Sequence, residues 1–250
     1  EALQQHDIKV QWNHRLAHIS TFDDHSHVIV DKLVKESLGY IIARTEWVVS
    51  KSQRFDVPFV IGADGHHSLV RRALEIDYNT VGDTQNFAVF EFKTDADLKK
   101  EMRLAVHDGS LNVLWPLPNR SCRWSFELLD YTAAEESRTK DRYEIQVGPG
   151  EYPMLTDDYL RELLQQRAPW FTSTVESIMW RHVVRFERRL ARTYGIQRAW
   201  LAGDAVHLTS PAGIQSMNVG LREASDLAAS ILRILRDNES SELLQIYNDD

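Results

Sequence analysis

Apolar and polar residues alternate along several short stretches of the chain, the pattern of strands that bury one face. In the first of these stretches Ile8, Val10 and Trp12 alternate, and residues 1–5 before it resemble the last turn of a helix. The pair Leu38-Gly39 predicts a turn between two further strands. The pattern predicts strands at 8–12, 28–30, 40–43, 86–93, 103–106, 112–117 and 122–129.

A different pattern follows at residues 56–76, where an apolar run gives way to small residues and then to helical spacing. The run Phe59-Val60-Ile61 predicts a buried strand, and Gly62-Ala63-Asp64-Gly65 predicts a tight turn. Ser68 is a suitable cap for the helix that follows. Glycines admit a ligand close to the backbone, and a helix N-terminus presents N–H groups. The turn is therefore a candidate cofactor cradle, and an ordinary connection between strand and helix is the alternative.

The same order returns near the C-terminus. The apolar run 199–202 runs into Gly203-Asp204, and from Asn218 onward apolar residues recur at three- and four-residue steps. A helix is therefore expected to begin at Asn218, with its positive dipole end facing the space left by the turn at 211–213. Such a helix end favours a group that carries or develops negative charge.

Strand signals dominate the region between these two segments. They predict a sheet-rich domain over 80–190, flanked by a first part at 1–79 and a remainder at 191–250. Residues 130–150 have few apolar side chains and predict a surface loop. Residues 159–167 predict a short helix that Pro169 ends.

Composition and charge restrict the function classes. The 250-residue chain has a net charge of -8, which argues against a general affinity for nucleic acid. The basic segment 181–192 is interleaved with apolar residues and predicts a strand or helix with one solvated face. No apolar run is long enough to span a membrane and the first residues do not resemble a signal peptide. The single Cys122 fits a reducing compartment, so a cytoplasmic location is expected.

Two longer segments resemble motifs of one enzyme family. IGADGHHSLVR (61–71) and GDAVHLTSPAGIQSMNVGLREASDLA (203–228) are similar to the Asp-Gly and Gly-Asp motifs of the FAD-dependent aromatic hydroxylases related to p-hydroxybenzoate hydroxylase. The resemblance implies an α/β fold: an FAD/NAD(P)-binding domain of the glutathione-reductase type, with an inserted, mostly antiparallel substrate-binding sheet domain. The family's GxGxxG segment does not occur in this sequence, so the FAD-binding domain is expected to be incomplete at its N-terminus.

The resemblance implies roles for the Gly-Asp segment. Asp204 would accept a hydrogen bond from a ribityl hydroxyl of FAD, and Gly203 would allow the close approach. Pro211 and Gly213 would shape the turn beside the isoalloxazine ring.

The same resemblance assigns the helix start and the first motif. The backbone at Met217 and Asn218 would face the pyrimidine edge of the flavin, where the positive helix end suits a reduced, anionic ring. Asp64 and Gly65, with Arg71, would lie near the pyrophosphate of FAD and take part in the transient binding of NAD(P)H.

Four positions depart from the family pattern. Ile214 and Ser216 stand where the family has glycine, and Glu223 and Asp226 stand where the next helix usually has Asp and Asn. If the turn needs a positive φ at Ile214 or Ser216, flavin affinity is expected to fall.

The implied activity is hydroxylation of a small aromatic or similarly electron-rich ring by FAD, NAD(P)H and O2, through a flavin C4a-hydroperoxide. A homodimer is compatible with this interpretation. The aromatic residues of the middle region have two interpretations, a substrate pocket or sheet and interdomain core, and these are Trp115, Trp124, Phe126, Trp170 and Trp180. No residue is assigned to proton transfer.

The residues also allow different chemistries. Asp204 and His207 are a candidate metal pair, to which His25 and His27 or His66-His67 would have to add ligands. Ser210 beside His207 suggests a hydrolase, but no G-x-S-x-G elbow supports it. The family resemblance is also compatible with a halogenase or dehydrogenase of the same fold, and with a non-catalytic fragment.

Overall fold

The computed structural model describes residues 2–38, 44–129, 155–209 and 216–249. These residues form two compact units. The first takes its residues from Glu1–Asn79, Arg189–Leu208 and Gln215–Asp250, and the second takes most of its residues from Thr80–Arg188. No helix among the described residues has the length and apolar character that crossing a membrane requires.

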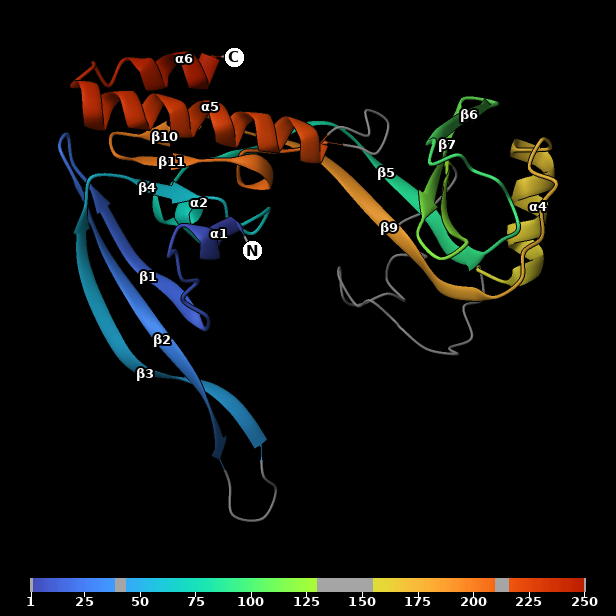
Figure 1. Cartoon of the computed structure of the whole chain (residues 1–250), viewed down its shortest axis with the longest axis horizontal. Coiled ribbons are helices and arrows are strands. Elements are labelled where there is room, and N and C mark those ends of the chain that lie inside the picture. The colour runs from blue at the N-terminus through green and yellow to red at the C-terminus, as the bar shows by residue number, and fades with distance from the viewer. Residues whose placement is uncertain (1, 39–43, 130–154, 210–215, 250) are drawn as a thin grey trace. The chain divides into compact units, whose positions relative to one another are not determined.

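The first unit is built from short helices and two small sheets, together with one long helix near the C-terminus (Figure 1). Its elements are α1 Ala2–Gln5, β1 His14–Thr21, β2 Ser26–Leu38, β3 Arg44–Val57, β4 Val60–Gly62, α2 Leu69–Ala73, β10 Gly195–Ile196, β11 Ala199–Leu201, the 3-10 turn η1 Gly203–Ala205, β12 His207–Leu208, α5 Ser216–Asp237 and α6 Leu243–Asp249.

Three antiparallel strands in the order β1-β2-β3 form the first sheet, and Figure 1 shows β2 and β3 as a long hairpin. The helix expected at 1–5 is α1. The strand expected at 8–12 is wrong: Trp12 is 77% exposed, and the ladder with β2 begins only at His14. Alternation predicts a strand only where a partner strand pairs with it. The predicted turn at Leu38-Gly39 and the strand at 40–43 lie largely outside the described residues.

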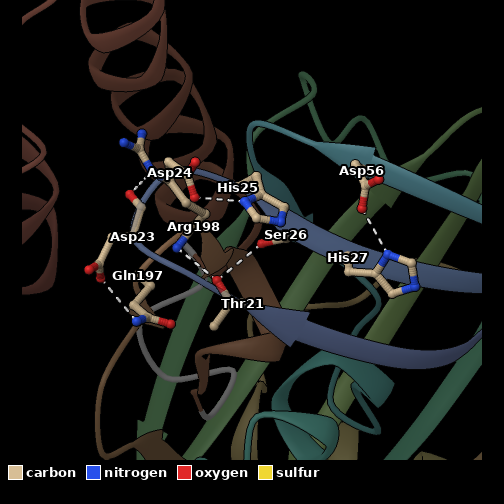
Figure 2. A network of polar contacts seen from close by, with 9 residues as sticks. All are labelled: Thr21, Asp23, Asp24, His25, Ser26, His27, Asp56, Gln197 and Arg198. Carbon is tan, nitrogen blue, oxygen red and sulfur yellow. Dashed lines mark hydrogen bonds and ion pairs between the residues drawn. The ribbon is translucent and has the colours of Figure 1, made fainter.

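The second sheet has the order β10-β11-β4 and carries both motif segments. The backbone N–H of Arg198 donates to Thr21 Oγ1 at 2.9 Å, and Arg198 Nε donates to the carbonyl of Asp23 at 2.6 Å (Figure 2). Gln197 Nε2 donates to Asp23 Oδ1 at 3.1 Å. These contacts hold the tight turn between β10 and β11 against the loop that joins β1 to β2. They therefore fix the strand that leads into the Gly-Asp turn.

The second unit is an antiparallel sheet with one helix against it. The sheet order is β12-β9-β5-β8-β7-β6, in which β12 pairs only with the end of β9 that belongs to the first unit. The basic segment at 181–192 lies in β9 as a strand. The strands and the helix of this unit are β5 Tyr78–Lys93, β6 Arg103–His107, β7 Ser110–Leu117, β8 Ser121–Glu127, α4 Asp157–Arg167 and β9 Ile178–Ala191.

One face of this sheet packs against α4 to form the core of the unit. Trp124 is fully buried, stacks on Phe126 with ring centroids 5.1 Å apart, and meets Phe171 edge-on. Burial of several large aromatic side chains at one place contributes strongly to stability. For Trp124 and Phe126 the core interpretation is therefore confirmed, whereas Trp170 remains 44% exposed. The loop predicted at 130–150 lies outside the described residues.

Cys122 belongs to the same core, and its environment predicts low reactivity. The residue is fully buried, and burial raises the pKa of its thiol to about 12. Because the thiolate is the reactive form, we expect Cys122 to resist 5,5′-dithiobis(2-nitrobenzoate) at pH 8 in the folded protein. The thiol should react within seconds once denaturant unfolds the chain. Rapid reaction in native buffer would contradict this prediction.

Candidate functional site

The two motif turns lie side by side because their strands are parallel neighbours. Strand β11 pairs with β4, with Leu201 opposite Gly62. A Cβ placed on Gly62 would lie 2.7 Å from Val70 Cβ and 2.9 Å from Leu201 Cδ2, so only glycine permits this packing. Ligands of open α/β sheets bind beyond the carboxyl ends of the strands, and both turns begin there.

The Gly-Asp turn presents an open backbone and an exposed acid. Gly203 has φ +61°, which favours glycine, and among the described residues no atom beyond its chain neighbours lies within 4 Å of a Cβ built on it. The side chain of Asp204 is exposed, and among the described residues it has no hydrogen-bond or ion-pair partner. A ligand could therefore approach the backbone at Gly203 and donate a hydrogen bond to the Asp204 carboxylate. These features fit the ribityl chain of a flavin.

In the Asp-Gly turn the first N–H groups of α2 are not offered to a ligand, as the sequence suggested, but are bound by protein side chains. Asp64 Oδ2 accepts hydrogen bonds from the N–H groups of Leu69 at 2.6 Å and Val70 at 3.2 Å. Ser68 caps the helix as predicted, because its Oγ accepts the N–H of Arg71 at 2.9 Å. The protein itself thus satisfies the first amides of this five-residue helix. Gly65 has φ +78°, and a Cβ built on it would meet no atom within 4 Å in the part of the chain that the structure describes, chain neighbours apart, so a ligand could approach the backbone there.

Arg71 connects the two turns through hydrogen bonds to a backbone carbonyl of each. The residue is 5% exposed, and its Nη1 donates to the carbonyl of Ala205 at 2.7 Å while Nη2 donates to the carbonyl of His66 at 2.6 Å. Its guanidinium lies 3.7 Å from the ring centroid of Tyr78, and burial lowers the pKa of Arg71 below its ordinary value. The structure therefore places this side chain among protein groups and leaves little of its surface to a ligand.

Tyr78 is a site residue that the sequence did not reveal. Its hydroxyl donates to the carbonyl of Asp204 at 3.1 Å, and its ring stacks with the guanidinium of Arg71. The two hydrogen-bonded residues are separated by 126 positions, so no local pattern could have indicated the contact. Arg71 and Tyr78 together hold the backbone of η1 at consecutive residues, Asp204 and Ala205.

The helix behind the Gly-Asp turn is α5, which begins at Ser216, two residues before the expected start. Met217 is 73% exposed and Asn218 is also exposed, so the first turn of the helix is accessible. Since Ser216 is helical, it does not need the positive φ that would disfavour serine. Pro211, Gly213 and Ile214 lie outside the described residues, and their predicted roles stay predictions.

His207 does not share the environment of Asp204. It is 9% exposed, and its Nε2 lies 2.8 Å from Oε1 and 2.9 Å from Oε2 of Glu223 on α5. Burial of a polar ring is tolerated when such a partner is present. The Asp-x-x-His pair is therefore divided between a solvent-facing carboxylate and a buried imidazole.

The metal hypothesis gains no support from the described segments, where no three His, Cys, Asp or Glu side chains gather as a metal site requires. His25 and His27, proposed as further ligands, each contact a carboxylate (Figure 2). His25 Nδ1 lies 2.6 Å from Asp24 Oδ1, and His27 Nδ1 lies 2.8 Å from Asp56 Oδ1. Ser210, the nucleophile of the hydrolase hypothesis, lies outside the described residues.

A family model described as an FAD binding domain matches residues 41–250. The chain is 31% identical over 199 residues to 6-methylpretetramide 4-monooxygenase of Streptomyces rimosus, a match that covers 79% of this chain and 32% of that protein. It is 26% identical over 196 residues to pentachlorophenol 4-monooxygenase of Sphingobium chlorophenolicum, covering 76% of this chain and 32% of that protein. The chain thus spans about a third of the length of these curated relatives.

Solved structures show the same fold. The crystal structure of p-nitrophenol 4-monooxygenase from Pseudomonas putida matches with a TM-score of 0.68 at 20% identity, over 98% of this chain and 54% of that chain. A ternary complex of aklavinone-11 hydroxylase with FAD and aklavinone matches with a TM-score of 0.65 at 20% identity, over 99% of this chain and 42% of that chain. A flavin-dependent halogenase matches with a TM-score of 0.70 at 17% identity, over 99% of this chain and 41% of that chain. At these identities the likeness concerns the fold alone.

Proposed function

We propose a function for this chain, which belongs to the FAD-binding-domain family. It is part of a flavoprotein monooxygenase that hydroxylates a small aromatic or similarly electron-rich ring. The single observation that carries the proposal is the Gly-Asp turn, where an open Gly203 lies beside Asp204, whose carboxylate has no partner among the described residues. The similarity to 6-methylpretetramide 4-monooxygenase and pentachlorophenol 4-monooxygenase supports the same reaction class.

Each residue of the turn has a task in this proposal. Asp204 accepts a hydrogen bond from a ribityl hydroxyl, and the missing side chain at Gly203 leaves room for the ribityl chain. The start of α5 favours negative charge at the pyrimidine edge of the ring, because the helix dipole is positive there. Bound FAD would supply the redox chemistry, taking a hydride from NAD(P)H and activating O2.

The protein groups behind the turn keep this arrangement in place. Arg71 and Tyr78 hold the carbonyls of Ala205 and Asp204, so the backbone that carries the Asp204 side chain is held in place. A preorganised acceptor costs less conformational entropy on binding than a mobile one. We further propose that residues 1–79 and 191–250 serve the flavin and that 80–190 serves the substrate. The one cysteine fits a cytoplasmic location.

Flavin binding is the first test. We expect the polypeptide encoded by the complete reading frame to be yellow when purified, or to become so with added FAD. Consumption of O2 should then depend on NADH or NADPH and on an aromatic substrate. The product should gain the mass of one oxygen atom.

Different products would point to a different reaction. A chlorinated product in the presence of chloride would favour a halogenase, and a product that has lost two hydrogens would favour a dehydrogenase. If the 250-residue chain alone gains no flavin absorbance while a longer polypeptide does, the chain by itself is a non-catalytic fragment.

A further inference from the structure

The contact between His207 and Glu223 joins the Gly-Asp turn to helix α5. His207 opens β12, two residues after η1 ends, and the N–H of Val206 donates to the carbonyl of Gly203 at 2.8 Å. The carbonyl of Val206 in turn accepts the N–H of Ala191 at 2.7 Å. The backbone between Asp204 and His207 is therefore short and held by hydrogen bonds, and a displacement of His207 would move the turn.

A second contact between the turn and the helix lies one helical turn before Glu223. A Cβ built on Gly220 would lie only 3.3 Å from the Cα of Gly203, so the helix touches the turn at that point. Residues 220 and 223 lie on neighbouring positions of one helix face. The helix thus meets the turn through a close backbone approach at Gly220 and through the side-chain pair at Glu223.

The surroundings of Glu223 make this pair sensitive to the loss of either partner. The side chains of His207 and Glu223 are 11% and 19% exposed. Burial, and then the charge of Glu223, raise the pKa values of Tyr194 and Tyr247, so the carboxylate acts on groups near β10 and in α6 as well. A partly buried carboxylate that loses its partner keeps its desolvation cost and loses the compensating hydrogen bond.

We propose that Glu223 is a positioning residue of the flavin site, which acts through His207 to hold the Gly-Asp turn in register with the start of α5. The proposal rests on the proposed function, because it assigns the turn and the helix start to the same flavin. Asp204 and the first amides of α5 come from segments separated by residues 210–215. The contact between His207 and Glu223 links these two segments directly. The Asp-x-x-His spacing then reflects a division of roles: Asp204 faces the ligand and His207 anchors the turn.

The test measures FAD affinity by the quenching of flavin fluorescence, in the complete polypeptide and at a temperature where far-UV circular dichroism shows every variant folded. The variants are Glu223→Ala, His207→Ala, the double variant and Glu223→Gln. We expect each alanine variant to weaken FAD binding about five- to tenfold, as for the loss of one coupled interaction. The double variant should bind no more weakly than the weaker single variant.

Two comparisons separate positioning from a general loss of structure. Glu223→Gln keeps an oxygen that accepts from the imidazole, so its FAD affinity should lie within about twofold of wild type. Arg233→Gln breaks the Arg233–Glu239 ion pair near the other end of α5, where Arg233 Nη2 lies 2.6 Å from Glu239 Oε2, and should leave affinity unchanged.

The outcomes distinguish this proposal from the proposed function. If wild-type protein binds FAD and the alanine variants bind it equally well, the positioning role is refuted while the function stands. Losses that simply add in the double variant would also refute it, because the two side chains would then act independently. Failure of the wild-type polypeptide to bind FAD would overturn both proposals.

Discussion

Replacement of Arg71 by alanine is expected to lower the free energy of unfolding by about 3 kcal/mol, since hydrogen bonds to a charged donor contribute about 1.5 to 3 kcal/mol each and are not additive. The variant loses the contacts to the carbonyls of His66 and Ala205 and the stacking on Tyr78. The carbonyls of Ala205 and His66 would lose their donor, the first of them in a buried contact. Urea unfolding followed by circular dichroism measures the change.

The adjacent arginine is a matched control. Arg72 also donates to backbone carbonyls, those of Ser68 and His67, but its side chain is exposed. Arg72→Ala should therefore cost less than about 1 kcal/mol. Arg71→Lys should recover little, because an ammonium cannot reproduce the fork that reaches two carbonyls. Equal losses for Arg71→Ala and Arg72→Ala would show that the link between the two turns contributes no special stability.

Replacement of Asp204 by alanine is expected to weaken FAD binding about 10- to 100-fold, because it removes a charge-assisted hydrogen bond worth about 1.5 to 3 kcal/mol. The fold should tolerate the change within about 0.5 kcal/mol, since the carboxylate is exposed and has no partner among the described residues. Isothermal titration with FAD gives the affinity, and thermal unfolding of the ligand-free protein gives the stability.

Asp237→Ala provides the comparison for the loss of one exposed acid. Asp237 is the last residue of α5, at the opposite end of the helix from its proposed flavin contact. We expect this variant to bind FAD as the wild type does. If Asp204→Ala binds FAD with unchanged affinity, the assigned role of the carboxylate is wrong, whatever the reaction of the protein.

The two strand-turn-helix segments could be identified from local patterns alone, but the expected burial of the first strand is wrong, because Ile61 is 48% exposed. Gly62 is required by its packing against Leu201 of the neighbouring strand, whereas Gly65 and Gly203 need no distant partner to be recognised, because their positive φ is a local requirement. The same holds for the cap at Ser68, whose acceptor and donor are three residues apart. Strands of the second unit were predictable from alternation as well, although β8 buries residues of both its faces.

Local patterns failed where a distant partner decides the outcome. Residues 8–12 alternate like a strand, yet the ladder of β1 starts at His14. The helix after the second turn starts at Ser216, although its apolar spacing indicated Asn218. Strand and helix ends depend on which backbone groups find partners, and the side-chain pattern indicates this only within a few residues.

By itself, the sequence determined the two glycine-containing turns, most strands of the second unit and the family resemblance that points to FAD. Only the tertiary structure decided how the charged residues of those turns are used. Asp64 caps α2, Arg71 and Tyr78 hold η1, and His207 pairs with Glu223, while Asp204 has no partner among the described residues and stays open to a ligand. The physical reason is that a polar side chain is free or occupied according to its neighbours in space, and the decisive neighbours of Arg71 and Tyr78 lie 134 and 126 positions away.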